Sequence, residues 1–187
     1  MADTAGMTNT PASPITLHKI TVTYSAEEDR LRLTAAAGDD QTVVYWITRR
    51  MLGVVLTPMF SWLENRASQG LGNVGEAAER SKQARLAMAQ SSAQAKMQDE
   101  TPVTAQPNSF EHLLTSVDVK TEQQRFLLLF PMQDQTKGII PFEQDSLLQW
   151  LNILHRIAQQ ASWELPQWPV WFIEGQSPQA PPKKALH

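Results

Sequence analysis

Two stretches of this chain show the same order of hydrophobic patterns, three short alternating segments followed by one long amphipathic segment. The first covers residues 15–64 and the second covers residues 109–175. Alternation of apolar and polar residues is typical of half-buried strands, and apolar spacings of three and four are typical of helices. The pattern predicts an α+β protein made of two similar β-β-β-α halves, with a mainly antiparallel sheet and helices packed on one face.

In the first half, strands are predicted at residues 15–24, 31–33 and 42–47. The alternation changes phase near His18, which predicts a bend or bulge in the first strand. Polar residues 25–29 and the sequence Gly38-Asp39-Asp40 predict the turns between the strands.

A helix is predicted from Thr48, its N-cap, to residue 64. Pro58 lies inside this helix and is expected to kink it or split it in two, because proline removes a backbone donor. The apolar residues of its inner face are Leu52, Val55, Leu56, Met59, Phe60 and Leu63.

In the second half, strands are predicted at residues 112–119, 125–130 and 138–142. The middle strand is almost continuously apolar, which indicates burial on both faces. A helix is predicted over residues 143–161, and a Trp-rich end follows it.

The two halves also share residues when Arg30 is placed over Arg125. A one-residue shift then aligns Trp46 with Phe142. One interpretation is that any two hairpins followed by amphipathic helices look alike. The other is a duplicated unit whose halves pack with pseudo-twofold symmetry into a sheet of roughly six strands, since each half alone is marginal in size. The aligned identities are Val22/Val117, Glu27/Glu122, Arg30/Arg125 and Leu33/Leu128.

Residues 65–108 form a polar, Ala/Gln-rich insertion that is predicted to be helical or flexible. Within it, residues 76–98 have high helix propensity, but only Leu86, Met88 and Met97 are sizeable apolar side chains. Such a helix is either exposed and marginal, or it is completed by a partner.

Composition narrows the functional classes. The net charge is −3 and charged residues make up 19% of the chain, which argues against nucleic-acid binding and against attachment to anionic membranes. The absence of cysteine excludes disulfides, thiolate metal sites and a cysteine nucleophile.

Targeting features are missing from the sequence. Residues 1–14 lack the basic and apolar regions of a signal peptide, and they are predicted to be a disordered leader. Residues 176–187 are Pro-rich and are predicted to be a disordered tail. The longest apolar stretch, residues 51–60, is too short to span a bilayer, so a cytoplasmic location is expected.

The first candidate binding site is Thr48, Arg49 and Arg50 at the predicted start of the first helix. Two arginines in the first turn oppose the helix dipole, and a helix N-terminus with added arginines can bind a phosphate, a carboxylate or an acidic partner surface. Alternatively, the arginines are exposed or paired with acidic residues, and Glu143 and Asp145 at the second helix start are the suggested partners.

The second candidate is the aromatic group Trp163, Trp168, Trp171 and Phe172. Tryptophan with proline is common at protein docking surfaces. The alternative is a C-terminal segment that is strapped across the sheet and covers it.

A search for catalytic, metal and cofactor sites identifies none. The histidines, at positions 18, 112, 155 and 187, have no metal-ligand spacing, and the acidic residues of the turns do not match a calcium loop. Nucleophile-elbow, P-loop and dinucleotide-binding motifs are absent. No cofactor is therefore expected.

The segment Glu28-Asp29-Arg30-Leu31-Arg32-Leu33, followed by Tyr45-Trp46-Ile47-Thr48-Arg49-Arg50 and an apolar helix, resembles a group of small uncharacterised proteobacterial proteins. These share an E-x-D-R-L-x-L … W-[IL]-T-R-R pattern, and the resemblance covers residues 15–64. It implies a bacterial cytoplasmic setting and no particular activity.

The expected function is that of a non-enzymatic interaction protein: an adaptor, accessory or assembly subunit of a larger complex, with a protein partner or a second copy of itself. The alternative is a binder of an anionic ligand or single-stranded nucleic acid at Thr48–Arg50. A third possibility is an enzyme that uses carboxylates.

Overall fold

The computed structural model describes residues 13–38, 41–70, 75–122, 124–133 and 136–176, and these ranges confirm the α+β class. The strands are β1 (Ile15–Thr16), β2 (His18–Ser25), β3 (Arg30–Ala36), β4 (Thr42–Ile47), β5 (Phe110–Leu113), β6 (Asp118–Thr121), β7 (Phe126–Pro131) and β8 (Lys137–Phe142). The helices are α1 (Arg49–Ser68), α2 (Glu76–Ala95), α3 (Gln144–Gln160) and α4 (Val170–Glu174).

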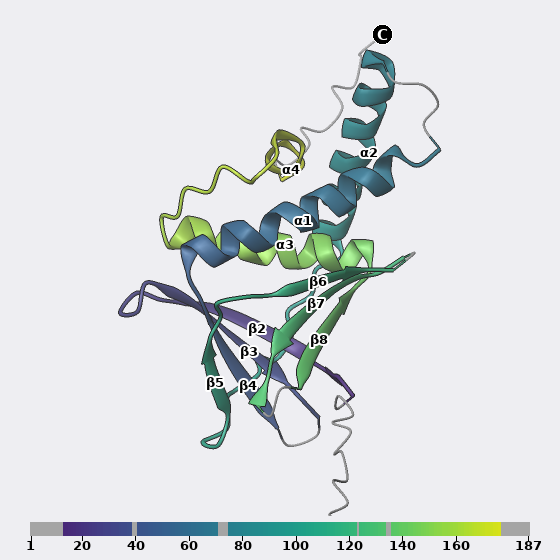
Figure 1. Ribbon diagram of the computed structural model, residues 1–187. Helices are drawn as coiled ribbons and strands as arrows, with labels where there is room; N and C mark the ends of the chain where they lie inside the picture. The colour runs from purple at the N-terminus through teal and green to yellow at the C-terminus, as the bar shows by residue number, and fades with distance from the viewer. Residues whose placement is uncertain (1–12, 39–40, 71–74, 123, 134–135, 177–187) are drawn as a thin grey trace, which may run out of the picture.

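The strands form two four-stranded sheets in place of the single sheet of about six strands that the sequence predicted. Their orders are β1-β8-β7-β6 and β2-β3-β4-β5. In each sheet three consecutive strands are antiparallel, and the fourth strand is parallel to its neighbour. Both sheets lie at one end of the molecule, and the helices gather at the other end (Figure 1).

The parallel strands are exchanged between the halves. β1 lies at the start of the first half but pairs with β8 of the second, and β5 lies at the start of the second half but pairs with β4 of the first. Leu17, which is buried, lies directly over Gly138, where an added Cβ would be only 2.8 Å from the Leu17 Cδ1 atom. Each sheet is therefore completed by a strand from the other half of the chain.

The prediction of a single strand at residues 112–119 is wrong, because the chain passes from one sheet to the other within this range. The structure has two strands there, β5 and β6, which belong to different sheets. Hydrophobic alternation shows which residues face a core, but it does not show where the chain leaves one sheet and enters the other.

The residue-by-residue alignment of the halves also needs correction. Val22 pairs with Leu33, and Val119 pairs with Leu128, so the counterpart of Val22 is Val119 and not Val117. The shift arises in the hairpin turns. Residues 25–30 separate the paired residues Tyr24 and Leu31, whereas residues 122–125 separate Thr121 and Phe126, so the second turn is two residues shorter.

The second register error concerns the third strand of each half. Ile47 pairs with Leu31 as Phe142 pairs with Phe126, so Ile47 and not Trp46 corresponds to Phe142. The bend predicted near His18 is confirmed by a register shift between His18 and Ile20, where Lys19 has a φ of 42°.

The core joins both sheets to the helices. The Tyr45 ring of β4 packs against Phe130 of β7 at 5.0 Å, and its hydroxyl donates to the Pro131 carbonyl. Burial raises the pKa of this hydroxyl, so it stays protonated and continues to donate. β7 is buried along almost its whole length, as predicted.

Helix α1 begins at its predicted cap, because the Thr48 hydroxyl accepts from the Met51 amide at 3.2 Å. The helix is continuous through Pro58, so the predicted split is wrong. The buried residues of α1 occupy one side of the helix, where Trp62 packs on Phe126 of β7 and Phe60 packs on the segment after α3.

Helix α2 is anchored within the chain, although its sequence predicted an exposed helix or one completed by a partner. Its buried residues, Leu86, Gln90 and Ala93, form one narrow stripe. The Gln90 amide donates to Asn152 of α3 at 2.6 Å, and Lys96 pairs with Asp145 at 2.7 Å. Gln90, the polar residue of this stripe, is buried because α3 supplies a matching amide.

The predicted leader (1–14) and tail (176–187) lie almost entirely outside the described residues, as do Asp39 and Asp40 of one predicted turn. Among the helices that the structure describes, none has the length and apolar character needed to cross a membrane.

Candidate functional site

The start of α1 meets the β2–β3 turn and the segment after α3 at Asp29. The Trp163 indole and the Tyr24 hydroxyl both donate to Asp29 Oδ1, each at 2.9 Å. These hydrogen bonds, that from Trp163 first, lower the pKa of the Asp29 carboxyl, and the charge of Arg49 lowers it further. Asp29 has a φ of 46°, a left-handed conformation that aspartate adopts more readily than most residues.

We expect Asp29→Asn to lower stability at neutral pH. Because the folded-state pKa of Asp29 lies below its unfolded value, its stabilisation is present above the unfolded pKa, near 4. That stabilisation is lost as the pH falls through the folded pKa. Urea-unfolding midpoints measured from pH 7 to pH 3 should show a smaller acid-induced loss in the variant than in the native chain.

Glu27→Gln is the control, because it removes the same charge from the same turn, and Glu27 has no hydrogen bond or ion pair among the described residues. Parallel pH profiles for the native chain and Asp29→Asn would contradict the role assigned to Asp29.

The predicted pairing of Arg49 or Arg50 with Glu143 and Asp145 is wrong. Glu143 lies 3.9 Å from Arg125, and Asp145 pairs with Lys96. Arg49 instead donates from Nη2 to the backbone carbonyl of Glu164 and lies near Asp29. The acidic residues at the start of α3 have closer basic residues, so they do not clasp α1.

A groove of about 690 Å³ runs between α1 and residues 164–167, and we call it the strap groove. The outward side of α1 contributes Arg49, Arg50, Gly53, Val54 and Thr57 to its wall. Val54 is 58% exposed, which is high for a valine. Arg50 is exposed and has no hydrogen bond or ion pair among the residues that the structure describes.

Glycine at position 53 lets the two walls of the groove approach each other. A Cβ added there would lie 3.1 Å from the Gln167 amide nitrogen. The side-chain Oε1 atom of Gln167 is buried and lacks a hydrogen-bond partner in the described structure, a situation that is costly for a polar atom. The groove is thus tightly closed at this point and open toward Arg50 and Val54.

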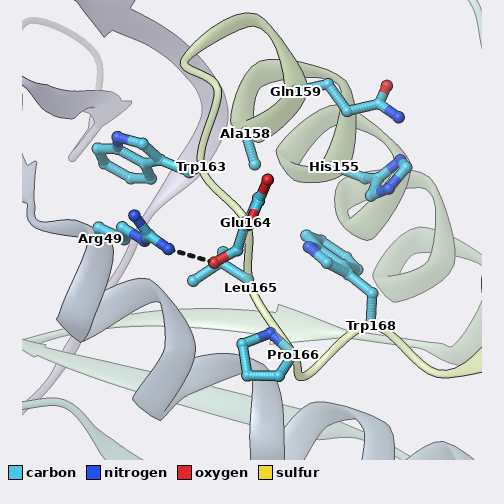
Figure 2. Close-up of a pocket in the computed structure, with 9 residues that line it drawn as sticks. All are labelled: Arg49, His155, Ala158, Gln159, Trp163, Glu164, Leu165, Pro166 and Trp168. Atoms are coloured by element: carbon cyan, nitrogen blue, oxygen red, sulfur yellow. Dashed lines mark hydrogen bonds between the residues drawn. The ribbon is translucent and has the colours of Figure 1, made fainter.

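A second pocket, of about 520 Å³, lies on the α3 side of the same segment, and we call it the indole pocket (Figure 2). Its principal lining residues are Trp163, Trp168, His155, Gln159, Glu164 and Arg49. Burial lowers the pKa of the His155 imidazole, and a hydrogen bond involving Gln176 opposes part of that effect.

Most of the aromatic group predicted as a docking surface is in the core. Trp163, Trp171 and Phe172 are buried, and Trp168 is half-buried. Phe60 of α1 lies at the centre, in edge-on contact with Trp168, Trp171 and Phe172 at 5.5–5.8 Å. The group is thus mostly buried, as the strap alternative predicted, but Trp168, Trp171 and Phe172 pack on helices α1 and α3 rather than across a sheet. Trp163 and Trp168 also line a pocket.

Sequence reasoning missed Asp29, Glu164 and Gln167 as parts of this region. Asp29 lies in the E-x-D-R-L-x-L pattern, which was the available signal. Glu164 and Gln167 are joined to α1 only by the fold, through the Arg49 bond and the contact over Gly53.

The two pockets differ in the side chains that line them. In the described part of the chain, no three His, Asp or Glu residues are grouped so that they could hold a metal ion. The strap groove offers guanidinium groups beside an apolar wall, and the indole pocket offers a carboxylate beside aromatic rings. No protein-family model, curated protein or solved structure was found to match the chain.

Proposed function

We propose that this chain is a non-enzymatic interaction protein, an adaptor or assembly subunit of a larger complex, and that it docks a partner protein in the strap groove. The partner segment is extended and combines an acidic side chain with apolar ones. The observation that carries this proposal is the placement of Arg50, a cation with no partner in the described structure, beside the exposed Val54.

Charge and shape support an acidic occupant. Arg49 and Arg50 lie at one end of the groove, and Gly53, Val54, Leu165 and Pro166 provide an apolar surface beside them. An acidic side chain paired with arginine guides association, while apolar contacts supply much of the affinity. A volume of about 690 Å³ is enough for a few residues of peptide.

A phosphate or single-stranded nucleic acid at Thr48–Arg50 is less well supported. The Thr48 hydroxyl already accepts from the Met51 amide, and Arg49 already donates to Glu164. Arg50 is therefore the principal free cation of this group, whereas a nucleic-acid backbone is usually bound by several.

We expect a photo-crosslinker placed at Thr57, an exposed residue of the groove wall, to capture a discrete partner in lysate of the source cells. Adding Arg50→Glu to this protein should reduce the crosslinked product by about tenfold, a change equivalent to about 1.4 kcal/mol. The yield is measured by gel shift, and mass spectrometry identifies the crosslinked peptide, which should contain acidic residues.

Two matched controls accompany this experiment. A crosslinker at Arg80, exposed on α2, tests site specificity, and Arg156→Glu on α3 makes the same charge change as Arg50→Glu at another exposed position. Equal products from both crosslinker positions, equal losses in the two charge variants, or capture of nucleic acid would contradict the proposal.

A further inference from the structure

The indole pocket has a different charge from the strap groove. Residues 164–168 separate the two, and α3 rather than α1 forms the far wall of the indole pocket. The carboxylate of Glu164 is exposed and has no hydrogen bond or ion pair in the described structure. Figure 2 shows this carboxylate pointing away from Arg49, between Trp163 on one side and His155 with Trp168 on the other.

Arg49 does not cancel the negative charge of Glu164. Its guanidinium donates to the backbone carbonyl of Glu164 rather than to the carboxylate, and the Asp29 carboxylate lies close to it. The two carboxylates of Asp29 and Glu164 and the one guanidinium of Arg49 together carry one net negative charge.

Aromatic rings lie on two sides of this carboxylate (Figure 2). The His155 imidazole meets the Trp168 ring edge-on, with the ring centroids 4.7 Å apart. Its burial favours the neutral form, so it adds no positive charge at neutral pH. Tryptophan faces attract cations, and the attraction grows where water is partly excluded.

We propose that the indole pocket binds an organic cation, an ammonium or guanidinium group, between the Glu164 carboxylate and the rings of Trp163 and Trp168. The site is independent of the proposed docking in the strap groove. The cation comes either from a lysine or arginine side chain of a protein or from a free small amine, and the shared chemistry is a positive group with an apolar shell.

The test is a titration of the full chain followed by the indole signals in ¹H–¹⁵N NMR spectra, assigned with Trp→Phe variants. Three probes are used: tetramethylammonium chloride, N-acetyl-lysine methylamide and, for ionic strength, sodium chloride. We expect either organic cation to give a saturating shift of the Trp163 and Trp168 signals, with smaller changes at the other indoles.

Glu164→Gln should weaken this binding by about fivefold or more, because it removes the negative charge with little change of shape. Glu174→Gln is the matched control, an exposed carboxylate at the end of α4, and it should leave the binding unchanged. Thermal midpoints of both variants show whether they remain folded.

The outcomes distinguish the two sources of the cation, a protein side chain and a free small amine. Saturation by tetramethylammonium supports a site for free amines, and saturation by the lysine derivative alone supports a protein side chain. Shifts that sodium chloride reproduces, no saturation with either cation, or equal loss in Glu164→Gln and Glu174→Gln would overturn the proposal. Since Arg50 is untouched, failure here is distinguishable from failure of docking in the strap groove.

Discussion

Replacing Phe60 with alanine should lower the free energy of unfolding by about 3–5 kcal/mol, the usual cost of removing a buried aromatic ring. Phe60 is only 5% exposed and contacts the rings of Trp168, Trp171 and Phe172. The cavity would lie between α1 and residues 163–174, which we call the strap, so neither side could easily collapse into it. Chemical denaturation followed by circular dichroism measures the change.

The same variant should expose tryptophan. Release of the strap would shift the emission to longer wavelength and increase quenching by acrylamide, whereas the native chain should give protected, blue-shifted emission. Val54→Ala, on the exposed side of the same helix, is the control and should change stability by less than about 0.5 kcal/mol. Equal effects of the two substitutions would show that the strap does not depend on Phe60.

Separating the halves should abolish cooperative folding. A fragment of residues 109–187 lacks β1, which pairs with β8, and it leaves β5 without β4. The complementary fragment, residues 1–108, has lost β5 and exposes the edge of β4. Neither fragment should show a cooperative thermal transition by circular dichroism, because each lacks a strand and much of the shared core.

Mixing the two fragments in equal amounts should restore the transition, since the exchanged strands and the Tyr45–Phe130 contact can form again between them. This recovery distinguishes mutual dependence from simple damage to each fragment. A fragment of residues 109–187 that unfolds cooperatively alone, with the stability of the full chain, would contradict the dependence.

The positions of several elements could be predicted because their signals are local. Thr48 caps α1, and the apolar run of β7 is buried. The sequence also distinguished the two helix starts correctly, since Glu143 and Ser146 form a capping box at α3 while α1 begins with arginines. Each of these depends on residues within one turn of each other.

The candidate site could be predicted only in part. Thr48, Arg49 and Arg50 were found because their charge conflicts with the helix dipole. The pairing proposed for them was wrong, because it assumed that the two helix starts face each other. In the structure, the Glu164 carbonyl and Asp29 lie beside Arg49, and they come from segments far apart in sequence.

The sequence by itself determined the positions of most strands and of helices α1 and α3, because hydrophobic period and capping chemistry act within a few residues. Only the tertiary structure decided that β1 and β5 cross to the opposite halves, and that the segment 164–167 lies against α1 to form the two pockets. A short strand shows the same alternation of apolar and polar residues whichever sheet it joins, so its sequence does not identify its partner strand. Its partner is chosen by close packing, such as Leu17 over Gly138, which involves residues more than a hundred positions apart.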